Sequence, residues 1–506
     1  MSETLGTAKN EKAIVRTVVR VERVKDDAIR IPESMTLEQL DAVVHARMEF
    51  ENKKVAIAAT IETPFIFEAA YALHAVLTEH FGWTDVIDTP TMGMFGPGPD
   101  EPPTMLSVPV GPGKTVQVPW GRFKLPGVTG YLESSATRER RGGPLKFQLQ
   151  GEVLRRDEEK VNALVDEIRR YVQEQSIYRN QAFGVSLTDE DGNDLPMPSP
   201  KFLTLDPTVE RELILPEATM ASVQANIFTV IEQTAMVRRH GIPLKRGILL
   251  AGEFGTGKTM VAHATASKAI RNGWTYIVCE KPQELAEVIR LARAYQPAVV
   301  FTEDIDRIMR GDERAIGTDQ ILNVIDGVES KGTELMVVLT TNELDKVTTA
   351  MLRPGRLDAV IHIGPPDAAA AEQLMRQYGR GLIAEETTLK KAGKELEGNI
   401  PAVIREVVEK AKLYAIGLSD DPAHLVLTDD ALYGAAVEMR EHRNRLSPKP
   451  ADDRSETVKA AALLAEAMKE TGNATPVFPL RSANDTLGSK GSGKWEENPD
   501  GSAREN

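Results

Sequence analysis

The feature that most constrains this chain is an apolar run that ends in a glycine-rich loop at residues 252–259. The pattern G-x-x-x-x-G-K-T is complete there, between the strand-like run 247–251 and a helical pattern. Small residues let backbone N–H groups close around phosphate oxygens at the N-terminal end of the following helix. The pattern therefore predicts a nucleotide phosphate site in a strand, loop and helix unit.

Two residues of this loop have specific expected roles. Lys258 brings a positive charge to the outer phosphates, and the Thr259 hydroxyl coordinates Mg²⁺. A glycine-rich turn before an ordinary helix is the alternative, and the complete motif disfavours it. The predicted contact set is Gly252, Glu253, Phe254, Gly255, Thr256, Gly257, Lys258, Thr259 and Met260.

A similar run, Gly-Pro-Gly-Lys-Thr at 111–115, lacks the required context. Val108 stands where the first glycine of the motif belongs, and the flanks 105–108 and 116–118 are typical of strands. This run is predicted to be a hairpin turn.

Length and composition limit the possible classes of protein. A chain of 506 residues is too long for one core, so two or three domains are expected. The formal charge of −14 argues against general polyanion binding. The single cysteine, Cys279, excludes an internal disulfide framework, fits a reducing cytoplasmic location and is expected in the core.

No membrane association is expected. The most apolar window, 55–77, contains Glu62 and Glu68. A carboxylate near a membrane-helix centre costs about 2.5–3.5 kcal/mol, against gains of about 0.3–0.6 for each large aliphatic residue. Residues 1–12 lack the apolar stretch of a signal peptide.

The hydrophobic pattern changes near residue 213. Short strands and helices without a catalytic cluster precede it, including an amphipathic helix at 157–175 and strands at 178–187 and 201–205. Strand and helix then alternate as in a parallel α/β sheet, with helices predicted at 220–240 and 319–328. Only helical patterns follow residue 367, and the end is rich in Gly, Ser, Asn and charge. The expected parts are an arm (1–35), an α+β substrate or partner domain (36–212), a large α/β subdomain (213–366), a small all-helical lid (367–446) and a mostly disordered tail (447–506).

Candidate catalytic residues follow two strands downstream of the loop. Glu303 and Asp304 directly follow the apolar run 298–302, and Asn342 directly follows the run 335–341. Hydrolysis needs one acid for the Mg²⁺ shell and another to orient or deprotonate water. Asn342 is expected to contact the γ-phosphate or the water.

Two arginines, Arg353 and Arg356, follow in the segment 350–358. Guanidinium groups neutralise charge on a transferring phosphoryl group, often from a neighbouring subunit. From the residues alone, surface salt bridges explain this pair equally well.

These motifs, in this order, resemble the AAA family within the AAA+ ATPases over about residues 213–416. The helix 400–409 is similar to the lid helix of that family. The resemblance implies ATP and Mg²⁺ as cofactors. It also implies a homo-oligomeric ring, a hexamer with a heptamer as alternative, in which Arg353 and Arg356 of one copy complete the site of the next.

Two departures refine the resemblance. The acids occur as Glu303-Asp304, in the order opposite to most of the family, so Glu303 matches the Mg²⁺ acid and Asp304 the catalytic acid. This order and the segments 321–329 and 340–346 are similar to the Bcs-type branch. In addition, no aromatic-hydrophobic-glycine triplet follows the strand at 275–279, which argues against threading of an unfolded chain.

The predicted function is a Mg²⁺-dependent ATP hydrolase that forms a ring and moves or remodels a protein partner. A nucleic-acid-linked motor or loader is one alternative. The basic pairs Arg140-Arg141 and Arg238-Arg239, with Arg138, give it thin support. A slow nucleotide-gated assembly scaffold is the other, because the inverted acids bear on the turnover rate.

Overall fold

The computed structural model describes residues 36–446, apart from 83–84, 89–91, 94–95, 99, 103, 139–144, 196, 207, 308–331, 348–356 and 419–424. The predicted arm, the tail and a helix predicted at 319–328 lie outside the described residues. The chain divides into two units, Met1–Met439 and Arg440–Asn506. Of the second unit, only residues 440–446 are described.

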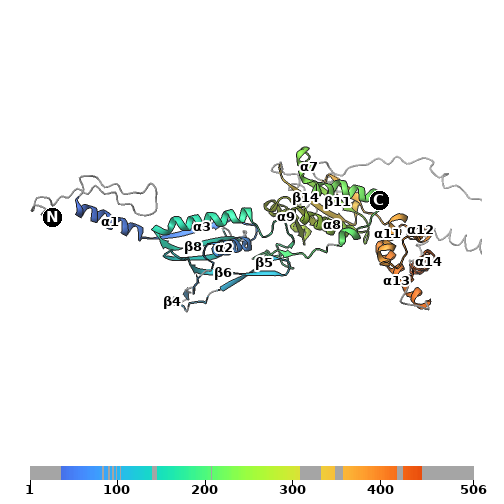
Figure 1. Cartoon of the computed structure of the whole chain (residues 1–506), viewed down its shortest axis with the longest axis horizontal. Coiled ribbons are helices and arrows are strands. Elements are labelled where there is room, and N and C mark those ends of the chain that lie inside the picture. The colour runs from blue at the N-terminus through green and yellow to red at the C-terminus, as the bar shows by residue number, and fades with distance from the viewer. Residues whose placement is uncertain are drawn as a thin grey trace, which may run out of the picture. The chain divides into compact units, whose positions relative to one another are not determined.

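An antiparallel sheet and three helices make up the first part of the chain (Figure 1). The sheet has the order β1-β8-β7-β6-β2, and β5 pairs with β6. Helices α2 and α3 pack together, and buried residues of both, such as Leu73 and Ile168, share a core with the sheet. The elements are α1 (Leu37–Glu51), β1 (Lys54–Ile61), α2 (Ile66–Phe81), β2 (Asp85–Val86), β3 (Met92–Gly93), β4 (Gly96–Pro97), β5 (Thr104–Gly111), β6 (Lys114–Lys124), β7 (Gly130–Thr137), β8 (Lys146–Leu154) and α3 (Arg155–Glu174).

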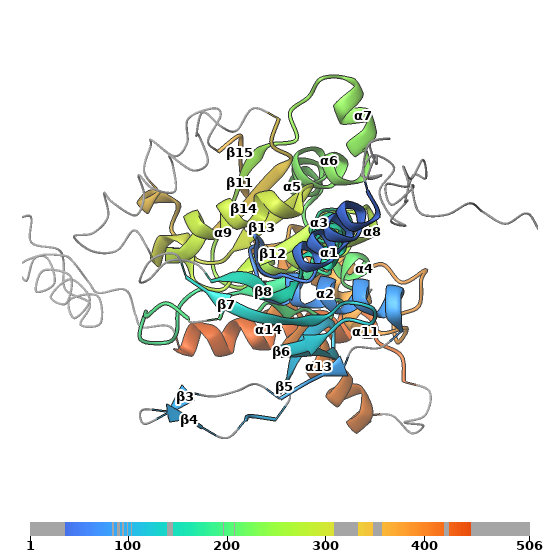
Figure 2. The same ribbon diagram turned by 90° about the vertical axis from the view of Figure 1, so that its left-hand side faces the viewer.

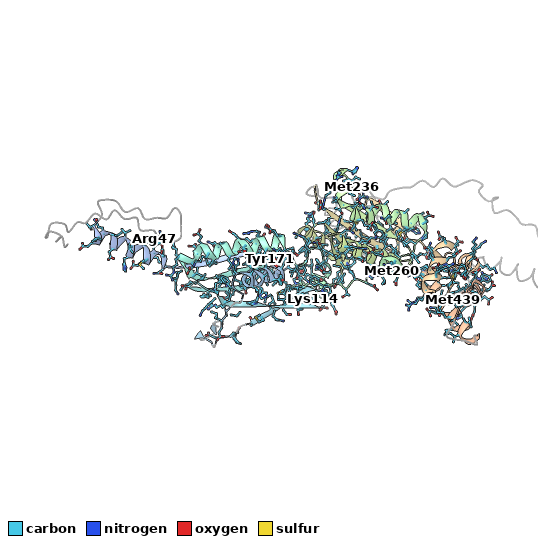
Figure 3. The ribbon with its side chains drawn as sticks, in the orientation of Figure 1. Arg47, Lys114, Tyr171, Met236, Met260 and Met439 are labelled. Carbon is cyan, nitrogen blue, oxygen red and sulfur yellow. The ribbon has the colours of Figure 1, made fainter. Side chains whose placement is uncertain are left out.

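The run at 111–115 is a hairpin turn, as predicted. Gly111 ends β5, Lys114 begins β6 (labelled in Figure 3), and the two strands pair antiparallel. Gly113 between them has φ of +65°, a conformation that favours glycine. This run therefore belongs to a sheet rather than to a phosphate loop.

A mixed α/β sheet forms the second part. Its order is β10-β9-β12-β13-β14-β11-β15, and every pairing except β10 with β9 is parallel. Figure 2 shows β12, β13, β14, β11 and β15 side by side in this order. Strands β13 and β14 are buried along their whole length, as their unbroken apolar runs predict.

The elements of this second part are β9 (Ala182–Val185), β10 (Lys201–Phe202), α4 (Val209–Glu212), α5 (Glu217–Val223), the π-helix η1 (Gln224–Phe228), α6 (Thr229–Glu232), α7 (Thr234–Arg239), β11 (Arg246–Ala251), α8 (Lys258–Arg271), β12 (Thr275–Cys279), η2 (Pro282–Glu284), α9 (Leu285–Ala292), η3 (Arg293–Tyr295), β13 (Ala298–Thr302), η4 (Ile305–Arg307), β14 (Leu335–Thr341), η6 (Leu344–Lys346) and β15 (Ala359–His362).

Strands β9 and β10 extend this sheet, although the sequence assigned them to the preceding domain. β9 runs parallel to β12, with Val185 opposite Cys279. The predicted boundary after residue 212 would separate two paired strands, and the limits of the independent folding units stay a prediction.

The single helix predicted over 220–240 is instead divided among α5, η1, α6 and α7. The Thr234 hydroxyl donates to the carbonyls of Val230 (3.0 Å) and Ile231 (2.8 Å). Side-chain bonds of this kind compete with the regular helical pattern, and α6 and α7 meet at this point.

Helices α11 (Ala368–Gly379), α12 (Lys390–Leu396), α13 (Pro401–Leu418) and α14 (Asp429–Leu446) follow the sheet. Within the first unit they bury a core of their own that includes Leu374, Ile404 and Leu432. Within the described ranges, no helix combines the length and the apolar character needed to cross a bilayer.

Candidate nucleotide site

The loop at 252–259 joins the buried strand β11 to helix α8, as the sequence predicts. A Cβ on Gly252 would lie 2.1 Å from the carbonyl oxygen of Ile363, so only glycine allows this approach. Gly255 (φ +78°) and Gly257 (φ +109°) adopt positive φ. These glycines set the path of the loop at the N-terminal end of α8.

Lys258 is buried within the loop. Its ammonium donates to the carbonyls of Gly252 (2.8 Å) and Glu253 (2.7 Å). Burial lowers the pKa of Lys258, while Asp304 and Glu303 act in the opposite direction. The loop carbonyls thus hold the ammonium, and the acids that follow β13 favour its charged form.

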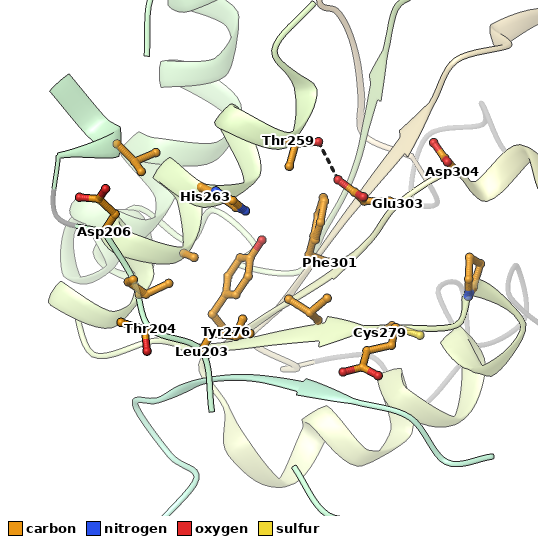
Figure 4. A pocket seen from close by; sticks show the side chains of 16 residues that line it. Leu203, Thr204, Asp206, Thr259, His263, Tyr276, Cys279, Phe301, Glu303 and Asp304 are labelled. Carbon is orange, nitrogen blue, oxygen red and sulfur yellow. Dashed lines mark hydrogen bonds between the residues drawn. The ribbon is translucent and has the colours of Figure 1, made fainter. Parts of the chain in front are cut away.

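The Thr259 hydroxyl donates to Glu303 Oε1 over 2.7 Å, as Figure 4 shows. A hydroxyl and a carboxylate are hard oxygen ligands of the kind that Mg²⁺ takes beside phosphates and water. Among the described residues, no three His, Cys, Asp or Glu side chains gather as an all-protein metal site. Thr259 and Glu303 thus fit the predicted Mg²⁺ position.

The neighbouring acid, Asp304, has different partners. Its Oδ1 accepts from Asn342 Nδ2 (2.8 Å), and its backbone N–H donates to Thr340 Oγ1 (3.0 Å). Its φ of +49° is left-handed, which Asp tolerates better than most residues. The structure therefore places the predicted acid and the predicted polar residue of the next strand in direct contact.

Asp306 is a site residue that the sequence reasoning did not single out. It is buried, and its Oδ1 accepts from Thr341 Oγ1 (3.2 Å) and the backbone N–H of Asn342 (3.4 Å). A third acid so close to Glu303 and Asp304 was the available signal. Asp306 holds the end of β14, and Asn342 with it.

A cavity of about 520 Å³ surrounds these groups, within the range of small-ligand sites. Its lining includes seven of the nine predicted loop contacts, and the other two, Gly252 and Glu253, accept hydrogen bonds from Lys258 through their carbonyls. The lining residues are Glu212, Leu213, Ile214, Leu215, Phe254, Gly255, Thr256, Gly257, Lys258, Thr259, Met260, Glu303, Asp304, Thr340, Asn342, Leu374, Gln377, Tyr378, Pro401 and Arg405.

The far wall of this cavity comes from the helical part of the chain. Tyr378 on α11 and the exposed Arg405 on α13 line it. The resemblance of 400–409 to a lid helix predicted this helix, but it did not predict that Arg405 lines the cavity. An arginine here adds positive charge to a cavity that contains Lys258.

A second cavity of about 510 Å³ adjoins the first (Figure 4). Both share Thr259, Glu303 and Asp304. The second is otherwise lined by residues of β12 and the loop after it, of α8 and β13, and by residues 203–206 and 209. Cys279 in its wall is buried, as predicted for a core residue, and burial raises the pKa of its thiol to about 12.

Arg353 and Arg356 lie outside the described residues, as do Arg140 and Arg141. Arg238, offered for nucleic-acid contact, forms a bidentate pair with Glu334 (2.7 and 2.5 Å). That pairing engages its guanidinium within the chain.

Known proteins share the central part of this chain. Residues 248–365 match the model of the ATPase family associated with various cellular activities (AAA). A 26S proteasome regulatory subunit 8 homolog of Schizosaccharomyces pombe is 32% identical over 216 residues, which cover 39% of this chain and 53% of the relative. Protein CdcH of Halobacterium salinarum is 30% identical, over 35% of this chain and 26% of the relative. The ATP-dependent zinc metalloprotease FtsH of Mycoplasmopsis pulmonis is 28% identical, over 48% and 34%.

The matched segments span between about a quarter and about half of the length of these relatives. The family match includes the glycine loop, both acids and Asn342. The parallel sheet and the loop between β11 and α8 agree with it as an α/β P-loop core. Residues 248–365 are therefore similar, in sequence and in fold, to the ATPase domain of the AAA family.

Proposed function

We propose that this protein is a Mg²⁺-dependent ATP hydrolase. One observation carries the proposal: a single cavity brings together Lys258, Thr259, Glu303, Asp304 and Asn342 from three different strand ends. The carboxyl ends of parallel strands meet at the same sheet edge, where α/β proteins bind ligands. The AAA match over these residues supports ATP as the nucleotide.

Each side chain has a proposed task. Lys258 binds the outer phosphates, and Thr259 with Glu303 holds Mg²⁺, which when bound supplies charge neutralisation at the phosphates. Asp304 orients the attacking water and accepts its proton at the carboxylate, while Asn342 fixes that carboxylate over 2.8 Å. Arg405 and Tyr378 close the cavity from the helical side.

We further propose a cytoplasmic homo-oligomeric ring, hexameric or heptameric, that remodels a protein partner. The names of the relatives, a proteasome regulatory subunit and an ATP-dependent protease, support action on proteins. Arg353 and Arg356 are proposed to complete the site of the adjacent copy. The helices α11–α14 are proposed as the lid, and the residues before the ATPase core as the partner domain.

One sequence feature and one set of contacts support a more specific proposal. The order Glu303-Asp304 supports a position near the Bcs-type branch. Lys281 and Glu284, in the loop after β12, contact the segment 187–189. A loop held in this way favours remodelling of folded partners over threading of an extended chain.

Phosphate release by the full chain with ATP and Mg²⁺ tests the proposal. Wild type is expected to turn over ATP, chelation of Mg²⁺ to stop turnover, and Lys258→Ala to abolish both binding and turnover. Lys114→Ala is the matched control, because Lys114 also stands in a Gly-Lys-Thr run but lies exposed on a hairpin. Equal loss in both variants, or no turnover by wild type, would contradict the assignment.

A further inference from the structure

The loop after β12 is tied to the loop after β9 through a buried carboxylate. Glu284 is 6% exposed and accepts hydrogen bonds from the backbone N–H of Leu187 (2.7 Å) and Thr188 (2.9 Å). It also accepts from the Thr188 hydroxyl. Three donors compensate the buried charge, so these contacts fix the position of the loop.

Lys281 also binds Thr188. Its ammonium donates to the carbonyl and to the hydroxyl of Thr188, each over 3.0 Å, and also to the carbonyl of Asp189. The Thr188 hydroxyl thus donates to Glu284 while it accepts from Lys281. We refer to Thr188, Lys281 and Glu284 as the Thr188 cluster.

The same loop contacts the strand end that carries the two acids. Thr302, the residue before Glu303, is fully buried and donates from its hydroxyl to the carbonyl of Cys279 (3.1 Å). The Cys279 thiol donates in turn to the carbonyl of Lys281 (3.0 Å). Figure 4 shows Cys279 on the strand beside the one that leads to Glu303 and Asp304. A continuous set of contacts therefore joins residues 187–189 to the acids.

We propose that the Thr188 cluster positions Glu303 and Asp304 for ATP hydrolysis, and that the hydrolysis rate depends in this way on the segment 187–189. The inference rests on the proposed ATPase function. Thr188, Lys281 and Glu284 are positioning residues, since none of the three lines the nucleotide cavity.

Nucleotide binding and hydrolysis should respond differently to this cluster. The proposed phosphate-binding groups have other printed partners: Lys258 donates to the carbonyls of Gly252 and Glu253, and Thr259 donates to Glu303. The attack of water, by contrast, depends on the exact place of the carboxylates, and a displacement of about 1 Å can cost about 100-fold in rate. The cluster is thus expected to affect kcat and to leave KM for ATP unchanged.

The test uses two variants of the full chain and one control. Thr188→Val keeps the shape of the side chain and removes the hydroxyl that both partners share. Glu284→Gln removes the charge and one acceptor. Glu287→Gln is the matched control, because Glu287 lies exposed on α9, where it pairs with Arg290 (2.8 Å). Measured quantities are kcat, KM, affinity for a fluorescent ATP analogue and the unfolding temperature.

We expect kcat to fall about tenfold or more in Thr188→Val and in Glu284→Gln, with unchanged KM and nucleotide affinity. The unfolding temperature should fall in both variants, because each change leaves buried polar groups with fewer hydrogen-bond partners, so kcat is measured well below it. The double variant should lose no more than the stronger single variant, because both act through one cluster. Wild-type kcat in Thr188→Val would overturn the inference while leaving the ATPase proposal intact. A kcat loss matched by an equal loss of nucleotide affinity would also overturn it, since that result indicates a general disturbance of the site rather than positioning of the two acids. Absence of turnover in wild type would overturn the ATPase proposal itself, and this inference with it.

Discussion

Glu303 and Asp304 are adjacent in the chain, yet their side chains have separate partners. Glu303 accepts from Thr259 in the first turn of α8, whereas Asp304 accepts from Asn342, which directly follows the neighbouring strand β14. The left-handed backbone at Asp304 turns the two carboxylates toward these different partners. This division supports Glu303 as the Mg²⁺ acid and Asp304 as the acid that serves the water.

The two acids should therefore fail in different ways when neutralised. Asp304→Asn is expected to keep Mg²⁺-dependent ATP binding and to lower kcat by about 10²–10⁴-fold, the range typical of a general base. Glu303→Gln is expected to raise the Mg²⁺ concentration required for turnover. Titration of Mg²⁺ in binding and phosphate-release assays measures both effects. A reversed pattern would exchange the two assigned roles.

Glu68 on α2 is an acid of a different kind, buried at 3% exposure outside the nucleotide site. Its Oε2 accepts from the Tyr295 hydroxyl (3.1 Å). Burial raises the pKa of Glu68 from 4.5 to about 7. The folded chain then binds this proton more tightly than the unfolded chain. The contribution of Glu68 to the free energy of unfolding is therefore fully present below pH 4.5 and is lost as the pH rises through about 7.

Glu68→Gln should remove this pH dependence. At about 1.4 kcal/mol per pKa unit, the shift corresponds to a loss of roughly 3 kcal/mol in the free energy of unfolding between pH 4.5 and pH 8. Denaturant unfolding at several pH values measures this loss in wild type, in Glu68→Gln and in a control variant. Glu79→Gln, an exposed change on the same helix, is expected to keep the wild-type slope. An unchanged slope in Glu68→Gln would assign the pH dependence to other groups.

At the scale of elements, the loop between β11 and α8 depends on glycine at two kinds of position. Gly255 and Gly257 adopt positive φ, whereas Gly252 has no room for a Cβ against the carbonyl of Ile363. That carbonyl directly follows β15, the strand paired with β11. The loop is thus shaped by its neighbour in the sheet as well as by its own sequence.

Gly252→Ala is accordingly expected to push β11 and the Ile363 segment apart. A clash of this kind costs about 1–3 kcal/mol in the free energy of unfolding, and it should also weaken ATP binding. Gly417→Ala on α13 is the control, because nothing lies within 4 Å of its added Cβ. Alanine there should stabilise by about 0.5–1 kcal/mol. Thermal unfolding and nucleotide titration of both variants provide the comparison, and equal behaviour would contradict the steric argument.

Local patterns predicted many elements of this fold, since each leaves a periodic signature in the sequence. The unbroken apolar runs of β13 and β14 predicted buried parallel strands, and the spacing at 161–172 predicted the amphipathic α3. The partners of β9 were not predictable in this way, because strand pairing over long separations leaves no local signal. The strand predicted over 201–205 contains β10, but nothing local indicated that it joins the second sheet through β9.

The residues of the candidate site show the same difference between local patterns and tertiary packing. Lys258, Thr259, Glu303 and Asn342 were predicted from the sequence, because they occupy fixed positions in recognisable motifs. Arg405 and the Thr188 cluster were not, since they reach their positions through tertiary packing of separate segments.

At the scale of the whole molecule, one buried cluster contains side chains from both sheets. Phe65, from the loop before α2, packs edge-on against Tyr178 and Phe183 and stacks on Tyr295, with ring centroids 5.3–6.3 Å apart. The part before the ATPase core therefore shares apolar contacts with it. We expect the two to respond together when nucleotide binds.

The central claim is that ATP is hydrolysed at a site that two copies of the chain share. Mixing two inactive variants tests it most directly: Asp304→Asn retains Arg356, and Arg356→Ala retains the complete loop and acids. The claim predicts that phosphate release, near background for each variant alone, rises in the mixture, because some sites then combine intact acids with an intact arginine. Turnover in the mixture that equals the average of the two separate variants, or full turnover by Arg356→Ala alone, would contradict it.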